Sequence, residues 1–338
     1  MRAGKIVSIG IVSLASLIVL VTAVAAIIFF ASSHSSSQQN FAPSSGQQAI
    51  SPAGNVVLFS ERHGNSSFLY RRDISGKKVR LTSAQSGIES EARFSHDGKL
   101  VVYCFAEGPN TKSQVWIVNL DGSNAHAITG KSEDALHPVF SPDDSKVFYA
   151  VSNITGNYSP VVRPARHDWD VYSIAIHSTA KAPVATPVQI THSAFYDLRS
   201  LDVAADGITP GATKLLISTT GYPIGALFEE FILGATGRDK IFQPHVPGES
   251  SVGPAYGDAR FMHDGMDILF LAARDGSDGN FDYNIYLMSD VTGGEVRQLT
   301  HLTGMTKELK VLPNGNATFV NGGASQVLDV NAQTVKPL

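Results

Sequence analysis

Two stretches of the sequence decide the fold: FSHDGKLVVYCF at residues 94–105 and FSPDDSKVFYAVS at residues 140–152. Each begins with a polar phrase that contains Asp, and a run of β-branched and aromatic residues follows. Because Asp bonds to its own backbone and Gly accepts positive φ, the phrase is typical of a tight turn between two strands. It recurs as ISPAG from Ile50, VAADG from Val203, FMHDG from Phe261 and VLPNG from Val311.

Each phrase belongs to a unit of four expected strands. In the second unit, one strand ends at the phrase and three more follow at residues 99–105, 113–122 and 125–129. A four-stranded antiparallel unit repeated about every 40–50 residues is typical of a propeller, in which neighbouring blades cover each other's faces. The sequence therefore predicts an all-β, six-bladed propeller that closes by packing between its first and last blades. An immunoglobulin-like array is the alternative, but it needs about seven strands per unit.

The N-terminal region differs in composition from the rest. Residues 6–31 carry no charge, and about 20 apolar residues span a bilayer as a helix. Arg2 and Lys5 precede this segment, and no further charged residue occurs before Glu61, so we expect residues 1–5 in the cytoplasm and the remainder outside. Cleavage as a signal peptide is the alternative. The expected organisation is a transmembrane helix at 6–31, a flexible Ser/Gln-rich tether at 32–48 and the propeller at 49–338.

Composition excludes several classes of protein. The chain of 338 residues is 43% hydrophobic and 17% charged, which excludes a disordered chain. A net charge of −4 argues against nucleic acid as a partner. The single cysteine, Cys104, lies in the apolar run VVYCF, where we expect a buried and inert thiol.

The connections are expected to differ between the two faces of the propeller. Chain reversal at each turn places the second-to-third connections and the blade-to-blade connections on one face. These connections are long, whereas the opposite face has short turns, with ITPGAT at residues 208–213 as the main exception. Long loops on a rigid scaffold often carry binding function. The long connections are residues 83–92, 130–137, 152–168, 192–199, 244–258 and 273–282.

The connection at residues 152–168 is the predicted partner-binding loop. Tyrosine, tryptophan and arginine side chains anchor many protein interfaces. The alternative is that the tryptophan packs into the blade while the arginines are solvated. The predicted partner-binding residues are Tyr158, Arg163, Arg166, His167 and Trp169.

A second set of candidates lies on blade-to-blade connections, near the expected mouth of the central channel. Three histidines in this set would suit a transition metal if the fold brought them together, whereas single loop histidines are usually solvated or hydrogen-bonded. The channel-mouth candidates are His137, His192, Asp197, Arg199, Asp258 and His301.

The run DGSDGNFD at residues 275–282 is a weak candidate for a metal site. Asp275, Asp278 and Asp282 provide the oxygen ligands that calcium prefers, but the run lacks the frame of an EF-hand. A polar hairpin loop of this composition needs no metal.

Motifs for catalysis are incomplete. GESSVG at Gly248 does not match the nucleophile elbow, and GKS at Gly130 lacks the earlier glycine of a phosphate loop. We therefore predict no catalytic residue and no cofactor.

The repeats resemble a known family. FSHDGKLVVY and VWIVNLDG in the second unit and NIYLMSDVTGGEVRQLT in the fifth are similar to the TolB-type β-propeller repeat, which is related to WD repeats. The resemblance covers residues 49–338 and implies a propeller that binds partner segments at the channel mouth. This chain has a predicted anchor and tether where the family has a small α/β domain and a cleaved signal.

Together these features predict a non-catalytic, membrane-anchored propeller outside the cytoplasm. It would bind a protein or peptide partner on the face with long connections and contact the membrane through its N-terminal helix. The alternative is a hydrolase or lyase with a metal or acid/base site at the channel mouth. The sequence does not indicate an oligomeric state.

Overall fold

The computed structural model describes residues 46–156, 165–176, 185–221, 225–234, 239–246, 256–263, 265–289 and 295–338. Within these ranges the chain forms 24 strands and no helix. The predicted transmembrane segment at 6–31 lies outside the described residues. Among the residues that are described, no helix has the length and apolar character to cross a membrane.

The first eight strands form one sheet. They are β1 (Gly46–Ile50), β2 (Val56–His63), β3 (Ser66–Asp73), β4 (Lys78–Arg80), β5 (Ile88–Phe94), β6 (Leu100–Ala106), β7 (Ser113–Asn119) and β8 (His126–Ala127). Strand β1 thus includes the last residues of the expected tether.

Four further sheets have four antiparallel strands each, in chain order. The first of them comprises β9 (Ala135–Phe140), β10 (Lys146–Gly156), β11 (Ala165–Ala175) and β12 (Val188–Gln189). The second comprises β13 (Ser200–Ala205), β14 (Thr213–Gly221), β15 (Gly225–Leu233) and β16 (Lys240–Phe242). The third comprises β17 (Tyr256–Phe261), β18 (Asp267–Asp275), β19 (Phe281–Ser289) and β20 (Arg297–Gln298). The fourth comprises β21 (Thr306–Val311), β22 (Ala317–Asn321), β23 (Ala324–Asp329) and β24 (Thr334–Pro337).

The prediction of an all-β propeller is confirmed, but the prediction of six separate blades is wrong in the number of separate sheets. Four sheets of four strands are separate, whereas β1–β8 are continuous. The reason is one parallel bridge between Ser67 of β3 and Ile88 of β5, which joins two antiparallel halves, β1–β4 and β5–β8. The N–H of Ser67 also donates to the carbonyl of Gly87 at 2.9 Å, which strengthens this junction.

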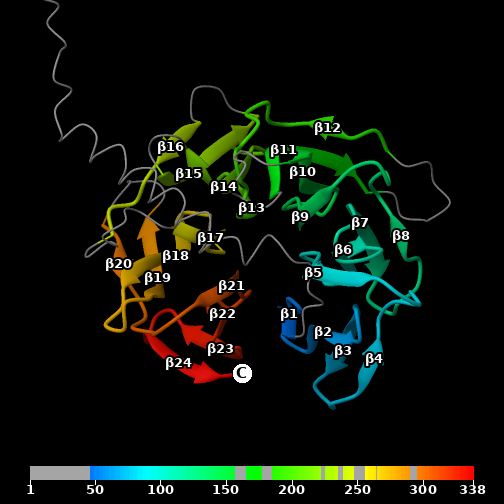
Figure 1. The fold of residues 1–338 in the computed structure, drawn as a ribbon, viewed down its shortest axis with the longest axis horizontal. Helices are drawn as coiled ribbons and strands as arrows, with labels where there is room; N and C mark the ends of the chain where they lie inside the picture. The colour runs from blue at the N-terminus through cyan, green and yellow to red at the C-terminus, as the bar shows by residue number, and fades with distance from the viewer. Residues whose placement is uncertain are drawn as a thin grey trace, which may run out of the picture.

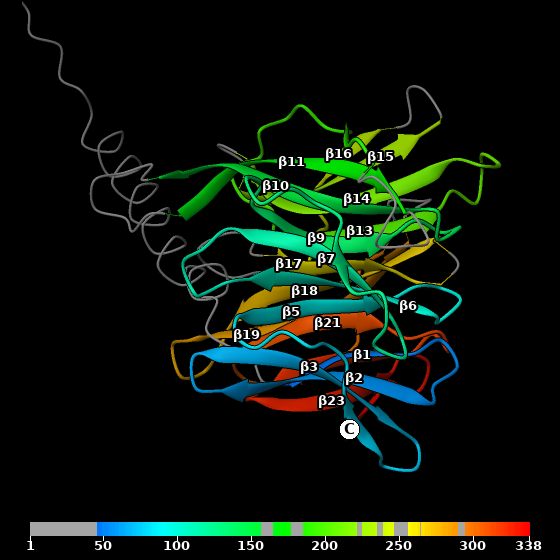
Figure 2. The ribbon, with the colours of Figure 1, turned by 90° about the vertical axis from the view of Figure 1, so that its right-hand side faces the viewer.

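The sheets are arranged around a common centre (Figure 1), with the first strands β5, β9, β13, β17 and β21 innermost and the fourth strands outermost. Each of these inner strands lies beside the next one around the ring. Figure 2 shows the ring from its edge, with β5, β9 and β13 running along its axis. Each inner strand therefore has one end at each of the two faces of the ring.

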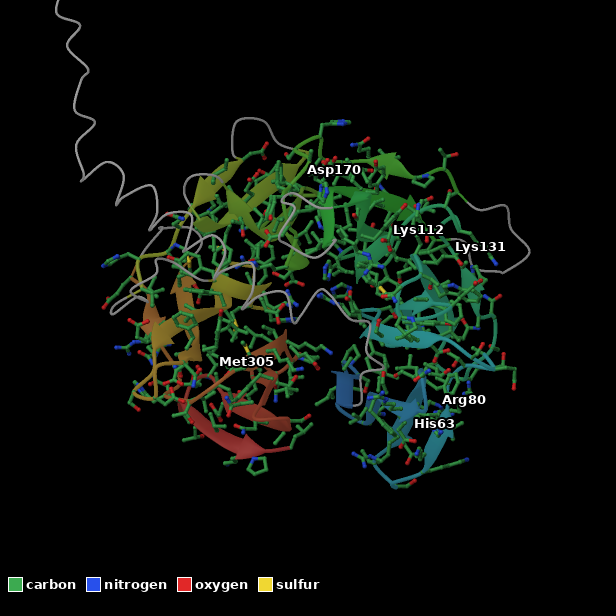
Figure 3. The ribbon with its side chains drawn as sticks, viewed as in Figure 1. His63, Arg80, Lys112, Lys131, Asp170 and Met305 are labelled. Atoms are coloured by element: carbon green, nitrogen blue, oxygen red, sulfur yellow. The ribbon has the colours of Figure 1, made fainter. Side chains whose placement is uncertain are left out.

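The core lies between neighbouring sheets, because successive residues of a strand point to opposite faces. In β18, Ile268 and Phe270 pack toward the β13–β16 sheet, whereas Leu269 and Leu271 pack toward the β21–β24 sheet. Side chains fill the spaces between the ribbons in this way around the ring (Figure 3). Five such buried clusters join successive sheets or halves, and among the described residues none of them spans β21–β24 and β1–β4. The expected closure by packing between the first and last blades is therefore absent from these clusters.

In several repeats a buried threonine lies two residues after the fourth strand. The Oγ1 atoms of Thr129, Thr191 and Thr300 each accept a third-strand N–H at 2.9 Å. Asp170, labelled in Figure 3, accepts from the Thr191 hydroxyl at 2.8 Å and from the N–H of Ser193 at 2.8 Å. These bonds fix the outer edge of each sheet to its third strand.

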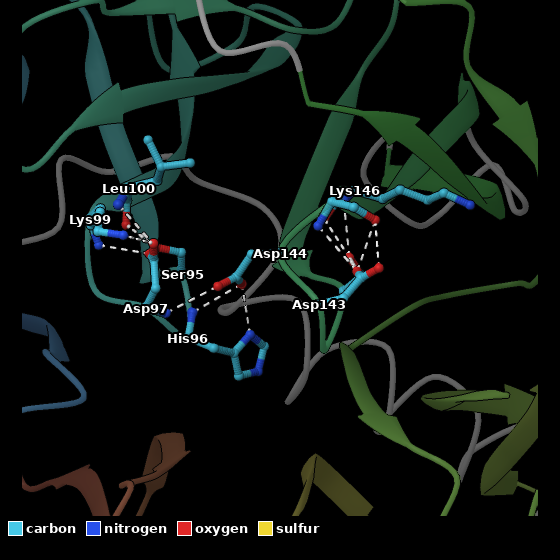
Figure 4. A network of polar contacts seen from close by, with 10 residues as sticks. Ser95, His96, Asp97, Lys99, Leu100, Asp143, Asp144 and Lys146 are labelled. Atoms are coloured by element: carbon cyan, nitrogen blue, oxygen red, sulfur yellow. Dashed lines mark hydrogen bonds and ion pairs between the residues drawn. The ribbon is translucent and has the colours of Figure 1, made fainter. Parts of the chain in front are cut away.

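The polar phrases at residues 94–98 and 140–144 form neighbouring turns (Figure 4). Asp144 stands where most phrases have Gly and adopts φ of 56°. Its carboxylate accepts the N–H groups of His96 and Asp97 at 3.0 Å each and lies 2.8 Å from Nδ1 of His96. The departure from Gly thus links the turns of two neighbouring sheets.

Two predicted connections differ in the structure. Residues 152–168 are largely strand rather than loop, because the β10–β11 ladder continues from Ser152↔Trp169 to Gly156↔Ala165. The connection from β11 to β12 comprises residues 176–187, so the face predicted to have short turns also carries a long segment here. The sequence did not predict this long connection, because β12 has only two residues and gives no clear strand pattern.

Candidate functional site

Five first strands contain a β-bulge at the same place in the repeat: β1, β5, β9, β17 and β21. In three of these bulges a non-glycine residue has positive φ, with 54° at Glu91, 54° at His137 and 60° at Glu308. This conformation costs about 1–2 kcal/mol for such residues. Bulges re-aim side chains and are frequent next to functional sites. The bulged segments of these innermost strands are therefore the candidate site.

Side chains at the bulges bind the backbone of the next sheet. Glu91 Oε2 accepts the N–H of His137 at 2.8 Å and lies 3.2 Å from Nδ1 of the same residue. Asp258 Oδ2 accepts the N–H of Leu309 at 3.2 Å, and Ser200 Oγ accepts an N–H of β17 at 3.0 Å. A bulge leaves backbone groups of its strand without a partner in the ladder. Side chains from the neighbouring sheet accept hydrogen bonds from these groups.

The Glu91 carboxylate is held in its charged form. Burial raises the pKa of this group, but the interaction with His137, the hydrogen bonds from His137 and the nearby Arg93 together lower it to about 2. Cys104 lies next to it, with Sγ 3.8 Å from the carboxylate, and burial raises the pKa of this thiol well above its ordinary value. A buried cysteine was expected from the sequence, and the described structure has it.

A second layer of charged residues lies two positions further along the inner strands. Arg93 of β5 reaches Asp202 of β13, with 2.9 Å between Nη1 and Oδ1, and donates from Nη2 to the carbonyl of Leu201 at 3.2 Å. Strand β9 lies between β5 and β13 around the ring, so this pair joins two inner strands that are not direct neighbours. Asp202 Oδ2 also accepts the N–H of Phe261 at 2.9 Å, which fixes the carboxylate to a third sheet.

Two cations of this layer are less fully paired. Arg260 donates from Nη1 to the carbonyl of Ala259 at 2.7 Å and lies 3.3 Å from Asp258, while its buried Nε has no hydrogen-bond partner among the described residues. Lys310 Nζ makes no hydrogen bond or ion pair with any described residue. Burial and the positive charges of Arg93 and Arg260 together lower the pKa of Lys310 to about 8, against the opposing effects of Glu308 and Asp258.

The charged residues of the inner strands thus form two layers. We call Glu91, His137, Asp258 and Glu308 the mouth layer, since inner strands begin on the face with the long connections. The deep layer lies nearer the turns of the opposite face and comprises Arg93, Asp202, Arg260 and Lys310. The mouth layer is mainly acidic and the deep layer mainly basic.

The predicted channel-mouth residues are placed in different ways. His137 and Asp258 belong to the mouth layer. Arg199 pairs with Asp197 at 2.9 Å and also donates to the Tyr256 carbonyl at 2.5 Å, so this pair joins two sheets. His192 and His301 are exposed, and Nδ1 of His301 is 3.2 Å from the Gln298 side-chain amide nitrogen.

The predicted metal candidates of the β18–β19 hairpin serve its turn. Asp278 Oδ1 accepts the N–H of Asn280 at 3.0 Å, and Asp282 Oδ1 accepts the N–H of Gly304 at 2.6 Å. Asp275 is opposite Phe281 in the ladder. Throughout the part of the chain that is described, no group of three or more His, Cys, Asp or Glu residues is placed to hold a metal ion.

The predicted partner-binding residues are only partly described. Tyr158 and Arg163 lie outside the described residues. Trp169 is 1% exposed and belongs to the core between the β9–β12 and β13–β16 sheets, as in the alternative interpretation. Arg166 contacts buried Asp134 at 2.5 Å, and His167 is 9% exposed with Nδ1 3.0 Å from Asp168.

The deep layer was not predicted, although the sequence carries a signal for it. Aligning the repeats at the polar phrase shows that the residue just before the phrase is charged in four of them: Arg93, Asp202, Arg260 and Lys310. When several buried strands carry a charged residue at the same repeat position, the side chains at that position are expected to face a common polar region.

Comparison with known proteins places the fold. No protein-family model matches the chain, and no curated protein sequence matches it. TolB from Acinetobacter baumannii has a TM-score of 0.59 at 15% identity, with 84% of this chain and 63% of that chain covered. The putative TolB from Agrobacterium tumefaciens has a TM-score of 0.54 at 17% identity, with coverage of 81% and 88%. An oligogalacturonate lyase in complex with manganese has a TM-score of 0.57 at 12% identity, with coverage of 86% and 75%.

These likenesses define the class of protein by its fold, which is a β-propeller. More particularly, it is a TolB-like propeller, as the repeats indicated. The chain spans less than two-thirds of the Acinetobacter structure. The similar structures include proteins named for different activities, so the likeness carries the fold and not the function.

Proposed function

We propose that this protein is a non-catalytic binding propeller whose channel mouth takes up a segment of a protein or peptide partner. The observation that carries the proposal is the convergence of Glu91, His137, Asp258 and Glu308 on bulged inner strands, three of them in a strained conformation. Strain persists where the surrounding structure over-determines it, and it clusters at ligand sites.

A site-specific photo-crosslinker tests this proposal in the full chain in its native membrane. Placed at Glu308, which is 37% exposed by side chain, the crosslinker should give a discrete adduct with one partner. The matched control is Ile74, which is 85% exposed in the β3–β4 turn on the opposite face. An adduct at Ile74 alone, or equal adducts at both positions, would contradict binding at the mouth.

The proposal includes a membrane anchor at residues 6–31, with the propeller outside the cytoplasm. Its support is the uncharged length of this segment and the positive residues before it. The full chain should remain in the membrane fraction after an alkaline wash, and deletion of residues 1–31 should release it. Recovery of the full chain in the soluble fraction would contradict the anchor.

The second candidate function is a hydrolase or lyase with an acid/base site at the channel mouth. Two observations favour it: the Glu91–His137 contact at 3.2 Å, and the Lys310 amine, whose pKa of about 8 suits a general base. Incubation with oligogalacturonate and with peptides, with and without added divalent metal ions, should give products in this case. Turnover that the variant Lys310→Met abolishes would support the enzyme and contradict the non-catalytic proposal.

A further inference from the structure

The deep layer places three cations at equivalent positions around the channel. Arg93, Arg260 and Lys310 are each the last residue before the polar phrase in β5, β17 and β21, opposite Val102, Leu269 and Thr318 in the neighbouring second strands. Because the first strands are the innermost ones (Figure 1), the three basic residues belong to one level of the channel. Burial is the main cause that lowers the pKa of Arg93 and of Lys310, and repulsion within this set of cations adds to it, which fits their proximity.

Arg93 serves as a fixed support within this level. Its guanidinium is paired with Asp202 at 2.9 Å and with the Leu201 carbonyl at 3.2 Å, and Asp202 is itself bound to the Phe261 N–H. Both hydrogen bonds from Arg93 go to residues of β13. A ligand therefore does not need Arg93 as its main partner.

Arg260 and Lys310 retain donors that are not used by the described residues. Arg260 is 8% exposed, yet its Nε has no partner in the described part of the chain. Its contact with Asp258 is single and 3.3 Å long, and the other oxygen of Asp258 is used by the Leu309 N–H. Lys310 Nζ is likewise without a hydrogen bond or ion pair among the described residues. Lys310 is half-buried, whereas the Nε of Arg260 is buried. Charges and donors that are shielded from water without partners are costly, and an anion with two oxygens would bond to both groups.

The mouth layer restricts the kind of anion that reaches this level. Glu91, Asp258 and Glu308 lie between the long-connection face and the deep layer, so a chain with a negative charge on every unit would meet three carboxylates first. A segment with one carboxylate and neutral or basic neighbours would match both layers. A peptide has this pattern at its C-terminus or at a single Asp or Glu.

We propose that Arg260 and Lys310, supported by Arg93, bind a carboxylate of the peptide segment that enters the channel mouth. The inference rests on the proposed function and names the group recognised there. The deep layer then recognises the carboxylate, and the mouth layer repels polyanions.

Calorimetry on the purified full chain in detergent tests the site with three probes. These are acetate, a pool of short peptides with free C-termini compared with the same pool amidated, and an oligogalacturonate. We expect acetate and the free-carboxyl pool to bind. In Lys310→Met their affinity should fall about tenfold or more, which corresponds to the loss of one charged contact. The matched control, Lys307→Met, removes an exposed lysine of the same strand and should leave binding unchanged.

The pH dependence provides a second readout. The groups around Lys310 are Glu308, Asp258, Arg93 and Arg260, and the pKa of Lys310 in the free protein is about 8. Carboxylate affinity should be constant below this value and fall as pH rises through it. The fall should be absent in Lys310→Met.

Several outcomes would overturn the inference. No binding of acetate or of the free-carboxyl pool at millimolar concentration would do so, as would equal binding to Lys310→Met. Tight binding of the oligogalacturonate alone would show a polyanionic sugar as the ligand instead of a peptide. If the crosslink at Glu308 persists in Lys310→Met with unchanged yield, the proposed function stands and the carboxylate site fails. If acetate binding depends on Lys310 but no crosslink forms at Glu308, the site stands and the proposed function fails.

Discussion

At the scale of single residues, the charges of the channel have two separate roles. Glu91 and Asp258 accept backbone N–H groups of the next sheet, so they contribute to the fold whether or not a ligand is present. In the described structure the buried Nε of Arg260 has no such structural partner. Lys310 is half-buried, and no hydrogen bond or ion pair joins its Nζ to another described residue. Stability measurements can therefore distinguish the structural groups from the binding groups.

Replacing Glu91 with Gln tests the structural role. The variant should lose about 1–2 kcal/mol of unfolding free energy near pH 7, because hydrogen bonds to a charged group contribute about this much. The pKa of Glu91 is lowered from 4.5 to about 2, so the advantage of the wild type should be complete above pH 4.5 and disappear as pH falls through 2. Urea unfolding at several pH values measures this difference.

The matched control is Glu107→Gln, which alters an exposed carboxylate 3.4 Å from Lys131 and should change stability very little. Equal stability of Glu91→Gln and the wild type at pH 7 would show that the contact with His137 contributes nothing.

Replacing Lys310 with Met should have the opposite sign and stabilise the free protein by about 1 kcal/mol at pH 7, because a desolvated and unpaired charge is removed. The pKa of Lys310 falls from 10.5 to about 8 on folding, so this penalty is complete below pH 8. It decreases as pH rises from 8 and is absent above 10.5. Thermal unfolding across this range should show the two proteins converging, and a destabilised Lys310→Met would mean that the amine has a stabilising partner.

At the scale of the strands, the repeat predicted most of the fold. The 24 strands follow the phrases in order because period-two patterns and turn residues are local properties of the sequence. The bridge from Ser67 to Ile88 and the extension of β10–β11 past Ser152 depend on neighbouring sheets, so no local pattern marks them. The same reason explains why the deep layer was not predicted. The sequence around Arg93 is typical of a strand whether its side chain faces water or the centre of the ring.

The extended β10–β11 hairpin is attached to the neighbouring β5–β8 half by Arg166. Its Nε lies 2.5 Å from Asp134, and its Nη2 donates to the Thr111 carbonyl at 3.2 Å. Asp134 is 4% exposed and also accepts the Ser113 N–H at 2.9 Å. Arg166 therefore joins two sheets on the long-connection face, in addition to any contact with a partner.

Replacing Arg166 with Ala should cost about 3 kcal/mol of stability, because it leaves a buried carboxylate without its cation. Denaturant unfolding measures the loss, and Lys131→Ala, which removes an 81% exposed lysine nearby, should have little effect. If Arg166→Ala retains full stability but loses the crosslinked partner, the residue acts in partner binding, as the sequence predicted, and not in the fold.

At the scale of the whole molecule, the two ends of the chain form the least supported part of the ring. Among the described residues, the β1–β4 half and the β21–β24 sheet each share a buried cluster with one neighbour only. The burial of the strands shows the difference: β18 is buried at six successive positions from Ile268 to Ala273, whereas buried and half-buried residues alternate in the first six positions of β2. The second face of β1–β4 carries aromatic and basic side chains instead, with Tyr70 stacked on Phe59 and Lys78 4.5 Å above the Tyr70 ring.

Hydrogen exchange should therefore be fastest at the ends of the chain. Amides of β2–β3 and β22–β23 should exchange through local opening of lower free energy than those of β14–β15 and β18–β19, since sheets buried on one face have fewer apolar contacts to lose. Mass spectrometry of peptides that cover these four pairs measures the order directly. Uniform protection around the ring would show that the first and last sheets close on each other in solution, and the channel would then be a rigid ring throughout. If β2–β3 and β22–β23 instead become protected only when a carboxylate probe is added, ligand binding in the deep layer must also tighten the seam, because Lys310 lies on β21 at its edge.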